Sequence, residues 1–91
     1  MEPIREVTVE FFGVPRQKAG RAELVVQACT VAEAIAAIEK HCPRLKGLTG
    51  NDGQMSPQYL LSVDGENFLA DVGLKLQPGS RLLLLSADAG G

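Results

Sequence analysis

Apolar and polar residues alternate in two stretches near the start of the chain. Apolar residues recur at every second position from Val7 to Phe11, and the residues between them are polar or charged. Successive side chains of a strand point to opposite faces, so this alternation predicts a half-buried strand within residues 4–12. Residues 22–28 form a second short run with β propensity. We expect the two runs to pair as an antiparallel hairpin joined by residues 13–21.

The connecting segment 13–21 contains a glycine and a proline that interrupt the first strand. We interpret this segment as a turn or loop. Its basic residues, Arg16, Lys18 and Arg21, are interpreted as solvated loop side chains.

The spacing of the apolar residues changes in the next segment. From Val31 onward they recur at the three- and four-residue spacing of one face of a helix. Thr30 and Glu33 have the spacing of a capping box, in which each side chain accepts a backbone N–H that the helix leaves unpaired. Pro43 cannot continue a helix. The pattern therefore predicts a helix over residues 30–41.

The second half of the chain consists of short apolar runs separated by turn signals. Residues 46–58 are rich in glycine and predict a long surface loop, with at most one turn of helix. Residues 59–63 predict a strand, and Asp64-Gly65 is a two-residue hairpin signal before a short strand near residues 66–69. A Pro-Gly turn precedes the last and most apolar strand, residues 81–86.

This order of elements predicts a single α+β domain. One helix of about 18 Å covers only one face of a four- or five-stranded sheet. We therefore expect a β-grasp (ubiquitin-like) fold, a mixed four- to five-stranded sheet curled around one main helix, with the first and last strands adjacent at its centre. A three-layer or barrel arrangement is the alternative. Residues 1–86 would form this domain, and residues 87–91 a flexible tail ending in Gly-Gly.

Four consecutive leucines occupy the last strand and point alternately to its two faces. One face packs on the helix, whereas the other has no second helix to cover it and would form an apolar patch suited to a partner. We assign Leu82 and Leu84 to partner binding, together with Phe12 and Ala89. The alternative is that loop 46–58 folds over the patch.

Composition argues against several classes of function. The 91 residues include 9 Lys and Arg against 11 Asp and Glu, a net charge of −2, with no Trp and one Tyr. Nucleic-acid binders usually carry a basic excess or aromatic stacking platforms, and this composition provides neither. No apolar run is long enough for a membrane span, and the first residues lack the pattern of a secretory signal. We therefore expect a cytoplasmic protein.

Chemistry within the domain is sparse. Cys29 and Cys42 flank the predicted helix, which would separate them by roughly 18–20 Å, whereas a disulfide needs Cα atoms within about 7 Å. Two cysteines and one histidine do not make a structural zinc site. We find no converging titratable residues and no phosphate-binding glycine motif. We expect no intrinsic enzyme activity, no metal and no cofactor bound by the chain itself.

Several short motifs along the chain are together more specific than any one of them. In order, they are Val9-Glu10-Phe11-Phe12-Gly13, Ala19-Gly20, Thr30-Val31-Ala32-Glu33-Ala34-Ile35, His41-Cys42-Pro43, Ser62-Val63-Asp64-Gly65-Glu66, Leu76-Gln77-Pro78-Gly79-Ser80 and the final Gly90-Gly91. In order and spacing, over nearly the whole length, the chain resembles the ubiquitin-like sulfur carriers of the MoaD/ThiS family.

The resemblance implies a function centred on Gly91. In this family a ubiquitin-activating-like adenylyltransferase, of the MoeB/ThiF type, binds ATP and magnesium and adenylates the C-terminal carboxylate. Sulfur then replaces AMP, and the resulting thiocarboxylate passes its sulfur to an acceptor such as the large subunit of molybdopterin synthase, of the MoaE type. Gly90 lacks a Cβ, which suits a tail that enters a narrow channel.

The resemblance leaves the pathway open. Our first choice is the small subunit of molybdopterin synthase, in molybdenum cofactor biosynthesis. A sulfur carrier for cysteine, thiazole or another thio-metabolite is the nearest alternative. A ubiquitin-like modifier conjugated to lysines through Gly91, and an interaction domain with an incidental tail, are alternatives of other classes.

Overall fold

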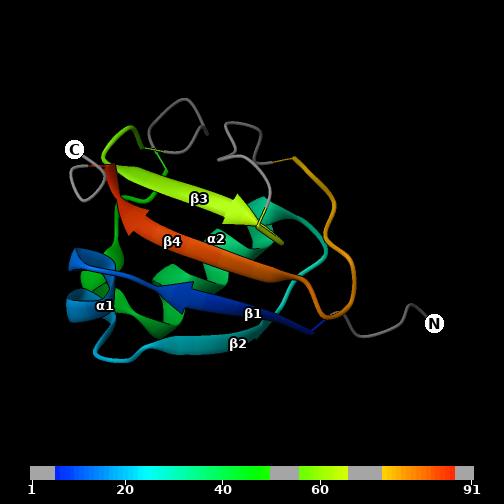
Figure 1. The fold of residues 1–91 in the computed structure, drawn as a ribbon, viewed down its shortest axis with the longest axis horizontal. Helices are drawn as coiled ribbons and strands as arrows, with labels where there is room; N and C mark the ends of the chain where they lie inside the picture. The colour runs from blue at the N-terminus through cyan, green and yellow to red at the C-terminus, as the bar shows by residue number, and fades with distance from the viewer. Residues whose placement is uncertain (1–5, 50–55, 66–72, 88–91) are drawn as a thin grey trace.

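The computed structural model describes residues 6–49, 56–65 and 73–87 of the chain. Within these residues, four strands form one mixed sheet, and a single long helix crosses one face of it (Figure 1). The strands are β1 (Glu6–Phe11), β2 (Glu23–Gln27), β3 (Tyr59–Val63) and β4 (Arg81–Ser86); the helices are α1 (Val14–Ala19), α2 (Val31–His41) and the 3₁₀ helix η1 (Pro43–Leu45).

The strand order in the sheet is β2-β1-β4-β3. Strand β1 pairs antiparallel with β2 and parallel with β4, and β4 pairs antiparallel with β3. The first and last strands are thus adjacent at the centre of the sheet, which confirms the predicted β-grasp arrangement. The strand predicted near residues 66–69 lies outside the described residues.

Helix α2 begins with Thr30 as its N-cap, as predicted, but the Glu33 side chain accepts the N–H of Cys29, one residue before the Thr30 N–H that a regular capping box uses. The Glu33 N–H donates to Thr30 Oγ1 at 3.2 Å, and Glu33 Oε1 accepts the Cys29 N–H at 2.9 Å. The apolar side of the helix, including Ile35 and Ile38, is buried. Within the described part of the chain, no helix is long and apolar enough to cross a membrane.

The connection between β1 and β2 differs from the prediction. We predicted a turn or loop over residues 13–21, but the segment contains the six-residue helix α1. Pro15 lies in its first turn, where a missing N–H costs nothing, and Gly20 ends it with a left-handed φ of 73°. A helix this short is marginal in isolation. Its contacts with β4 and η1, and the burial of Pro15, stabilise it in the fold.

Two turns set the ends of β3 and β4. After β3, Asp64 and Gly65 have φ values of 53° and 76°, the positive values that a tight hairpin turn of the primed type requires. Before β4, Gly79 has a φ of 83°, and the Ser80 N–H donates to the Gln77 carbonyl at 3.0 Å. This second geometry is the type II turn that the Pro-Gly sequence predicts.

The sheet has an inner face, which packs against α2, and an outer face, which does not. On β4 the inner residues are Leu82 and Leu84, which are 1% and 0% exposed. The assignment of these two leucines to partner binding is therefore wrong. The parallel register aligns Leu82 with Val9 and Leu84 with Phe11, so the four side chains share the buried face.

We predicted that loop 46–58 lies on the surface, but its first residues are hydrogen-bonded to α2. Glu39 Oε2 accepts the N–H of Gly47 at 3.0 Å and that of Leu48 at 3.2 Å. Leu48 is completely buried and belongs to the core. The alternative of a loop that covers the outer leucines falls mainly on residues 50–55, which lie outside the described residues.

Candidate functional site

The predicted tail leaves the domain at the end of β4. The Ala87 N–H donates to the Gln58 carbonyl at 2.9 Å, which continues the β3–β4 pairing one step past the last strand residue. We call this anchored point the tail root. The predicted site residues Ala89, Gly90 and Gly91 lie outside the described residues. The structure therefore describes the predicted tail only at its first residue, Ala87.

An apolar surface lies on the outer face of the sheet beside the tail root. Leu83 and Leu85 of β4 are half-buried there, and Leu85 pairs with the half-buried Leu60 of β3. The N–H of Phe12 donates to the Leu84 carbonyl at 2.9 Å, so Phe12 continues β1 beside β4. We call these four side chains, Phe12, Leu60, Leu83 and Leu85, the outer apolar surface.

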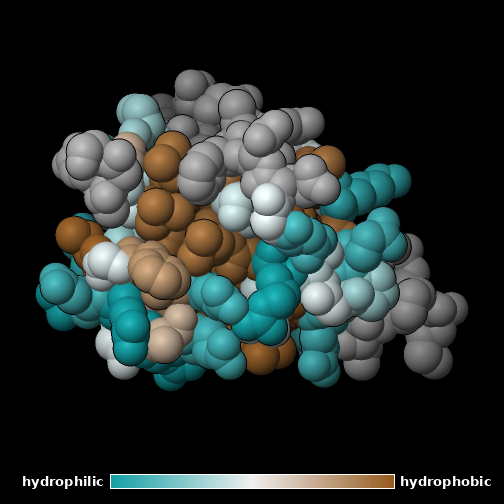
Figure 2. All heavy atoms as spheres, viewed as in Figure 1, coloured by the Kyte–Doolittle hydropathy of each residue, from teal (hydrophilic) through white to brown (hydrophobic). Residues whose placement is uncertain are grey.

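Figure 2 shows hydrophobic atoms gathered over the parts of β3 and β4 that lie toward α1 and the tail root. Phe12 is the most exposed member of the outer apolar surface, with 60% of its area accessible. Its assignment to partner binding stays a prediction, and its position is suited to that role. The sequence interpretation missed Leu60, Leu83 and Leu85. The alternation of β1 could have identified the outer leucines if the β1–β4 register had been known.

Away from the tail root, the outer face carries a small ionic network. The Arg81 guanidinium pairs with the Glu10 carboxylate, and its Nη2 lies 3.6 Å from Glu23 Oε2. The hydrogen bond and the charge of Glu10 raise the pKa of Arg81 above its ordinary value. The network joins β4, β1 and β2, and its one guanidinium and two carboxylates leave a net negative charge.

A hollow of about 230 Å³ adjoins the tail root and lies between α1, the start of β3 and the end of β4. Lys18 Nζ donates to the Tyr59 hydroxyl at 3.3 Å and lies 6.0 Å from the centroid of the Tyr59 ring. These contacts hold a half-buried ammonium group at the hollow. We call it the tail-root hollow, and it is lined by Val14, Lys18, Gln58, Tyr59 and Ser86.

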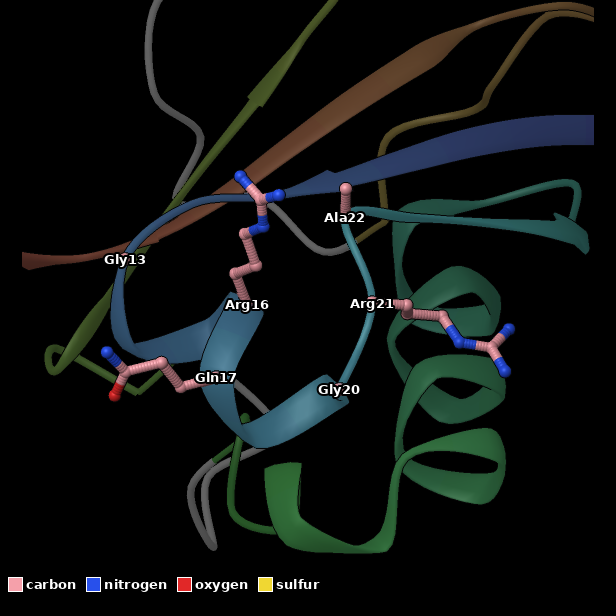
Figure 3. Close-up of a pocket in the computed structure, with 6 residues that line it drawn as sticks. All are labelled: Gly13, Arg16, Gln17, Gly20, Arg21 and Ala22. Atoms are coloured by element: carbon pink, nitrogen blue, oxygen red, sulfur yellow. The ribbon is translucent and has the colours of Figure 1, made fainter.

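A larger hollow of about 540 Å³ opens between α1 and the segment that leads into β2 (Figure 3). Two glycines, Gly13 and Gly20, contribute to its wall. The side chains of Arg16 and Arg21 extend in different directions, so their guanidinium groups do not converge (Figure 3). The hollow therefore lacks the convergent polar groups typical of a small-molecule site.

Residues 6–49, 56–65 and 73–87 contain no group of three or more His, Cys, Asp or Glu side chains that could hold a metal ion. Cys29 and Cys42 are both free thiols, as predicted. Burial raises the pKa of the Cys42 thiol above its ordinary value, and this effect outweighs the opposing charge of Arg21. Cys42 is therefore a protonated core residue at neutral pH and a poor nucleophile.

Comparison with solved structures identifies the architecture. The small archaeal modifier protein 1 of Haloferax volcanii superposes with a TM-score of 0.80 and 23% identity, over 94% of this chain and 99% of that chain. CysO, from the BexX/CysO complex of Amycolatopsis orientalis, superposes with a TM-score of 0.78 and 22% identity, over 93% of this chain and 99% of that chain. The chain has the β-grasp fold.

Two further β-grasp neighbours extend this comparison. A putative molybdopterin converting factor subunit 1 from Pyrococcus furiosus gives a TM-score of 0.74 and 20% identity, over 90% of this chain and 97% of that chain. Urm1 from Trypanosoma brucei gives a TM-score of 0.69 and 15% identity, over the full length of both chains. The neighbours are ubiquitin-like proteins of the MoaD/ThiS type, as the sequence resemblance predicted. No family model and no curated protein matches the chain in sequence.

Proposed function

We propose that this chain is a sulfur carrier whose C-terminal Gly91 is converted to a thiocarboxylate by a partner enzyme and then donates its sulfur. The observation that carries the proposal is the tail root: the last strand of a β-grasp domain ends beside a partly exposed apolar surface, of which Phe12 is the exposed member. A carrier needs both features, a surface by which a partner holds the domain and a chain end that reaches that partner's active site.

The chemistry needs only a carboxylate from this chain. A C-terminal carboxyl group has a reference pKa of about 3.3–3.7, so it is ionised at neutral pH. One carboxylate oxygen attacks the α-phosphorus of ATP, and pyrophosphate leaves with the electron pair of the broken P–O bond. A sulfide equivalent then attacks the acyl carbon and expels AMP. ATP and magnesium belong to the adenylating partner in this scheme.

Reach and tail composition fit this scheme. The five residues after Ser86 span at most about 18 Å when extended. The final two are glycines, which adopt any φ/ψ that a narrow channel imposes. The proposal requires Gly91 to be the last residue of the protein in the cell, which an intact-mass measurement on the endogenous protein checks.

We place the carrier first in molybdopterin biosynthesis, as the small subunit of molybdopterin synthase. One structural neighbour is a putative molybdopterin converting factor subunit, which supports this choice. A carrier for cysteine, thiazole or another thio-metabolite is the alternative acceptor assignment, and the neighbour CysO favours it.

Conjugation to protein lysines through Gly91 is the second candidate function, since another neighbour is a small archaeal modifier protein. Immunoblots that show a ladder of covalent adducts, lost from a variant without Gly91, would favour the modifier over the carrier.

Incubation of the full chain with purified ubiquitin-activating-like adenylyltransferases, ATP, magnesium and sulfide tests the carrier proposal. We expect intact-mass spectrometry to show the gain of one sulfur for one oxygen at Gly91. A variant with one glycine added after Gly91 displaces the reacting carbon by more than about 3 Å and should react orders of magnitude more slowly. An unchanged mass under conditions where the enzyme binds the chain would refute the proposal.

A further inference from the structure

Basic residues concentrate at the end of the molecule that bears the tail root. Segments 13–22 and 40–49 hold six of the nine Lys and Arg residues of the chain and no Asp or Glu. Helix α1 contacts both η1 and β4, so the two segments meet at the end of the sheet where β4 finishes (Figure 1). We call this region the basic end, and its members are Arg16, Lys18, Arg21, Lys40, Arg44 and Lys46. Its charge is opposite to the net charge of −2 of the whole chain.

The two carboxylates that border these segments in sequence, Glu23 and Glu39, are engaged elsewhere: Glu23 Oε2 lies 3.6 Å from Arg81 Nη2. Glu39 Oε2 accepts the backbone N–H groups of Gly47 and Leu48, and its side chain is occupied there. Among the residues that the structure describes, Lys18 makes no ion pair with a carboxylate. Its ammonium is instead fixed by the Tyr59 hydroxyl and ring. An ammonium group that is half-buried and held in one place gains more from a carboxylate than a freely solvated lysine does.

We propose that the basic end docks against an acidic surface of the adenylating partner, and that one carboxylate side chain of that partner enters the tail-root hollow and pairs with Lys18. This inference rests on the proposed function. The volume of about 230 Å³ admits a side-chain carboxylate, and the tail starts at the wall of the hollow. The ion pair would therefore aim the tail at the partner's active site.

Two observations favour a protein carboxylate over a nucleic-acid phosphate. Tyr59, the aromatic residue of the hollow, is only 8% exposed and offers no face on which a base could stack. The hollow's Tyr59 and Ser86 are next along β3 and β4 to Leu60 and Leu85 of the outer apolar surface but point to the other face, so a partner surface with an apolar part and an acidic part would contact both by reaching around this end of the sheet. Phe12 and Lys18 are the residues expected to contact these two parts.

ATP–pyrophosphate exchange with the adenylating enzyme that acts on the wild-type chain tests the inference. We expect Lys18→Met to raise the KM for the carrier by about tenfold or more and to leave kcat unchanged, because a charge-assisted hydrogen bond is lost on binding. Lys18→Arg should restore most of the affinity. Lys75→Met, the matched control, removes an exposed charge beside Thr30, at the start of α2, and should have no effect.

Salt dependence provides a second measurement. Raising the salt concentration should increase the KM of the wild-type chain more than that of Lys18→Met, because the variant has already lost the screened interaction. Tyr59→Phe keeps the ring contact but removes the hydroxyl that accepts the Lys18 hydrogen bond, so it should give a smaller increase in KM. Thermal unfolding of each variant separates these effects from loss of the fold.

Four results would overturn the inference. If the KM of Lys18→Met in the exchange reaction equalled that of the wild-type chain, the docking site would be refuted. The carrier function would be left intact. If none of the purified adenylyltransferases supported exchange with the wild-type chain, both the docking site and the carrier function would be refuted. A fall in kcat without a change in KM would assign Lys18 a different role. Binding of oligouridylate to the wild-type chain, lost in Lys18→Met, would assign the basic end to RNA instead.

Discussion

The two faces of β4 present the same residue type in two different roles. Leu82 and Leu84 are buried against the core, whereas Leu83 and Leu85 lie half-buried on the outer face. Burying a leucine side chain fully contributes about 1.5–3 kcal/mol to folding. The inner pair therefore contributes mainly to stability, while the outer pair retains apolar area for a partner. The comparison shows that the pleat of the strand, and not the residue type, separates stability from recognition.

The largest effect that tests this comparison is on stability. Leu84→Ala removes a side chain that is 0% exposed, so we expect the free energy of unfolding to fall by about 2–5 kcal/mol through lost burial and the cavity left behind. Leu85→Ala is the matched control, one position along the same strand, and should cost much less. Urea unfolding monitored by circular dichroism measures both. Equal losses would show that the two faces are not distinct.

The next effect concerns binding. Phe12→Ala truncates the most exposed side chain of the outer apolar surface, and we expect the KM for the carrier in pyrophosphate exchange to rise about tenfold, as for an aromatic interface anchor. Stability should change by no more than about 0.5 kcal/mol. Val25→Ala, on the outer face of the edge strand β2 and 55% exposed, is the control and should bind normally. A similar increase in KM for Phe12→Ala and Val25→Ala would contradict a localised docking surface.

The smallest effect concerns the turn that leads into β4. Gly79 has a φ of 83° with open space around the position of a Cβ, so the cost of Gly79→Ala comes from the backbone and not from a clash. We expect a loss of about 1 kcal/mol in the free energy of unfolding. Gly79→Asn, which tolerates a left-handed conformation better, should lose less. If Gly79→Ala left the free energy of unfolding unchanged, the turn would not help to set the register that separates the two leucine pairs.

Elements with strong local signals could be predicted from the sequence. The helix after Thr30, the strand 59–63 and the Pro-Gly turn before β4 are found where the pattern predicted them. Helix α1 was missed because six residues with a proline carry little helical signal of their own, and packing against β4 and η1 stabilises them. Lys18 was interpreted as a solvated loop residue for the same reason.

The candidate site depended more heavily on tertiary contacts. Phe12 lies beside the tail root because β1 pairs in parallel with β4, a contact between the two ends of the chain. The tail-root hollow requires α1, β3 and β4 together, so no local segment predicts it. The basic end could have been suspected from the two segments that lack acidic residues, but their proximity comes from the contact of α1 with η1.

By itself, the sequence determined the local elements other than α1, because helical periodicity, strand alternation, capping and turn chemistry act over a few residues. It also determined that the last strand supplies apolar side chains to both faces. Only the tertiary structure decided which leucines face inward, since a run of identical residues has no alternation to reveal its phase. That phase comes from the β1–β4 register, which places Val9 beside Leu82 and leaves Leu83 and Leu85 on the outer face.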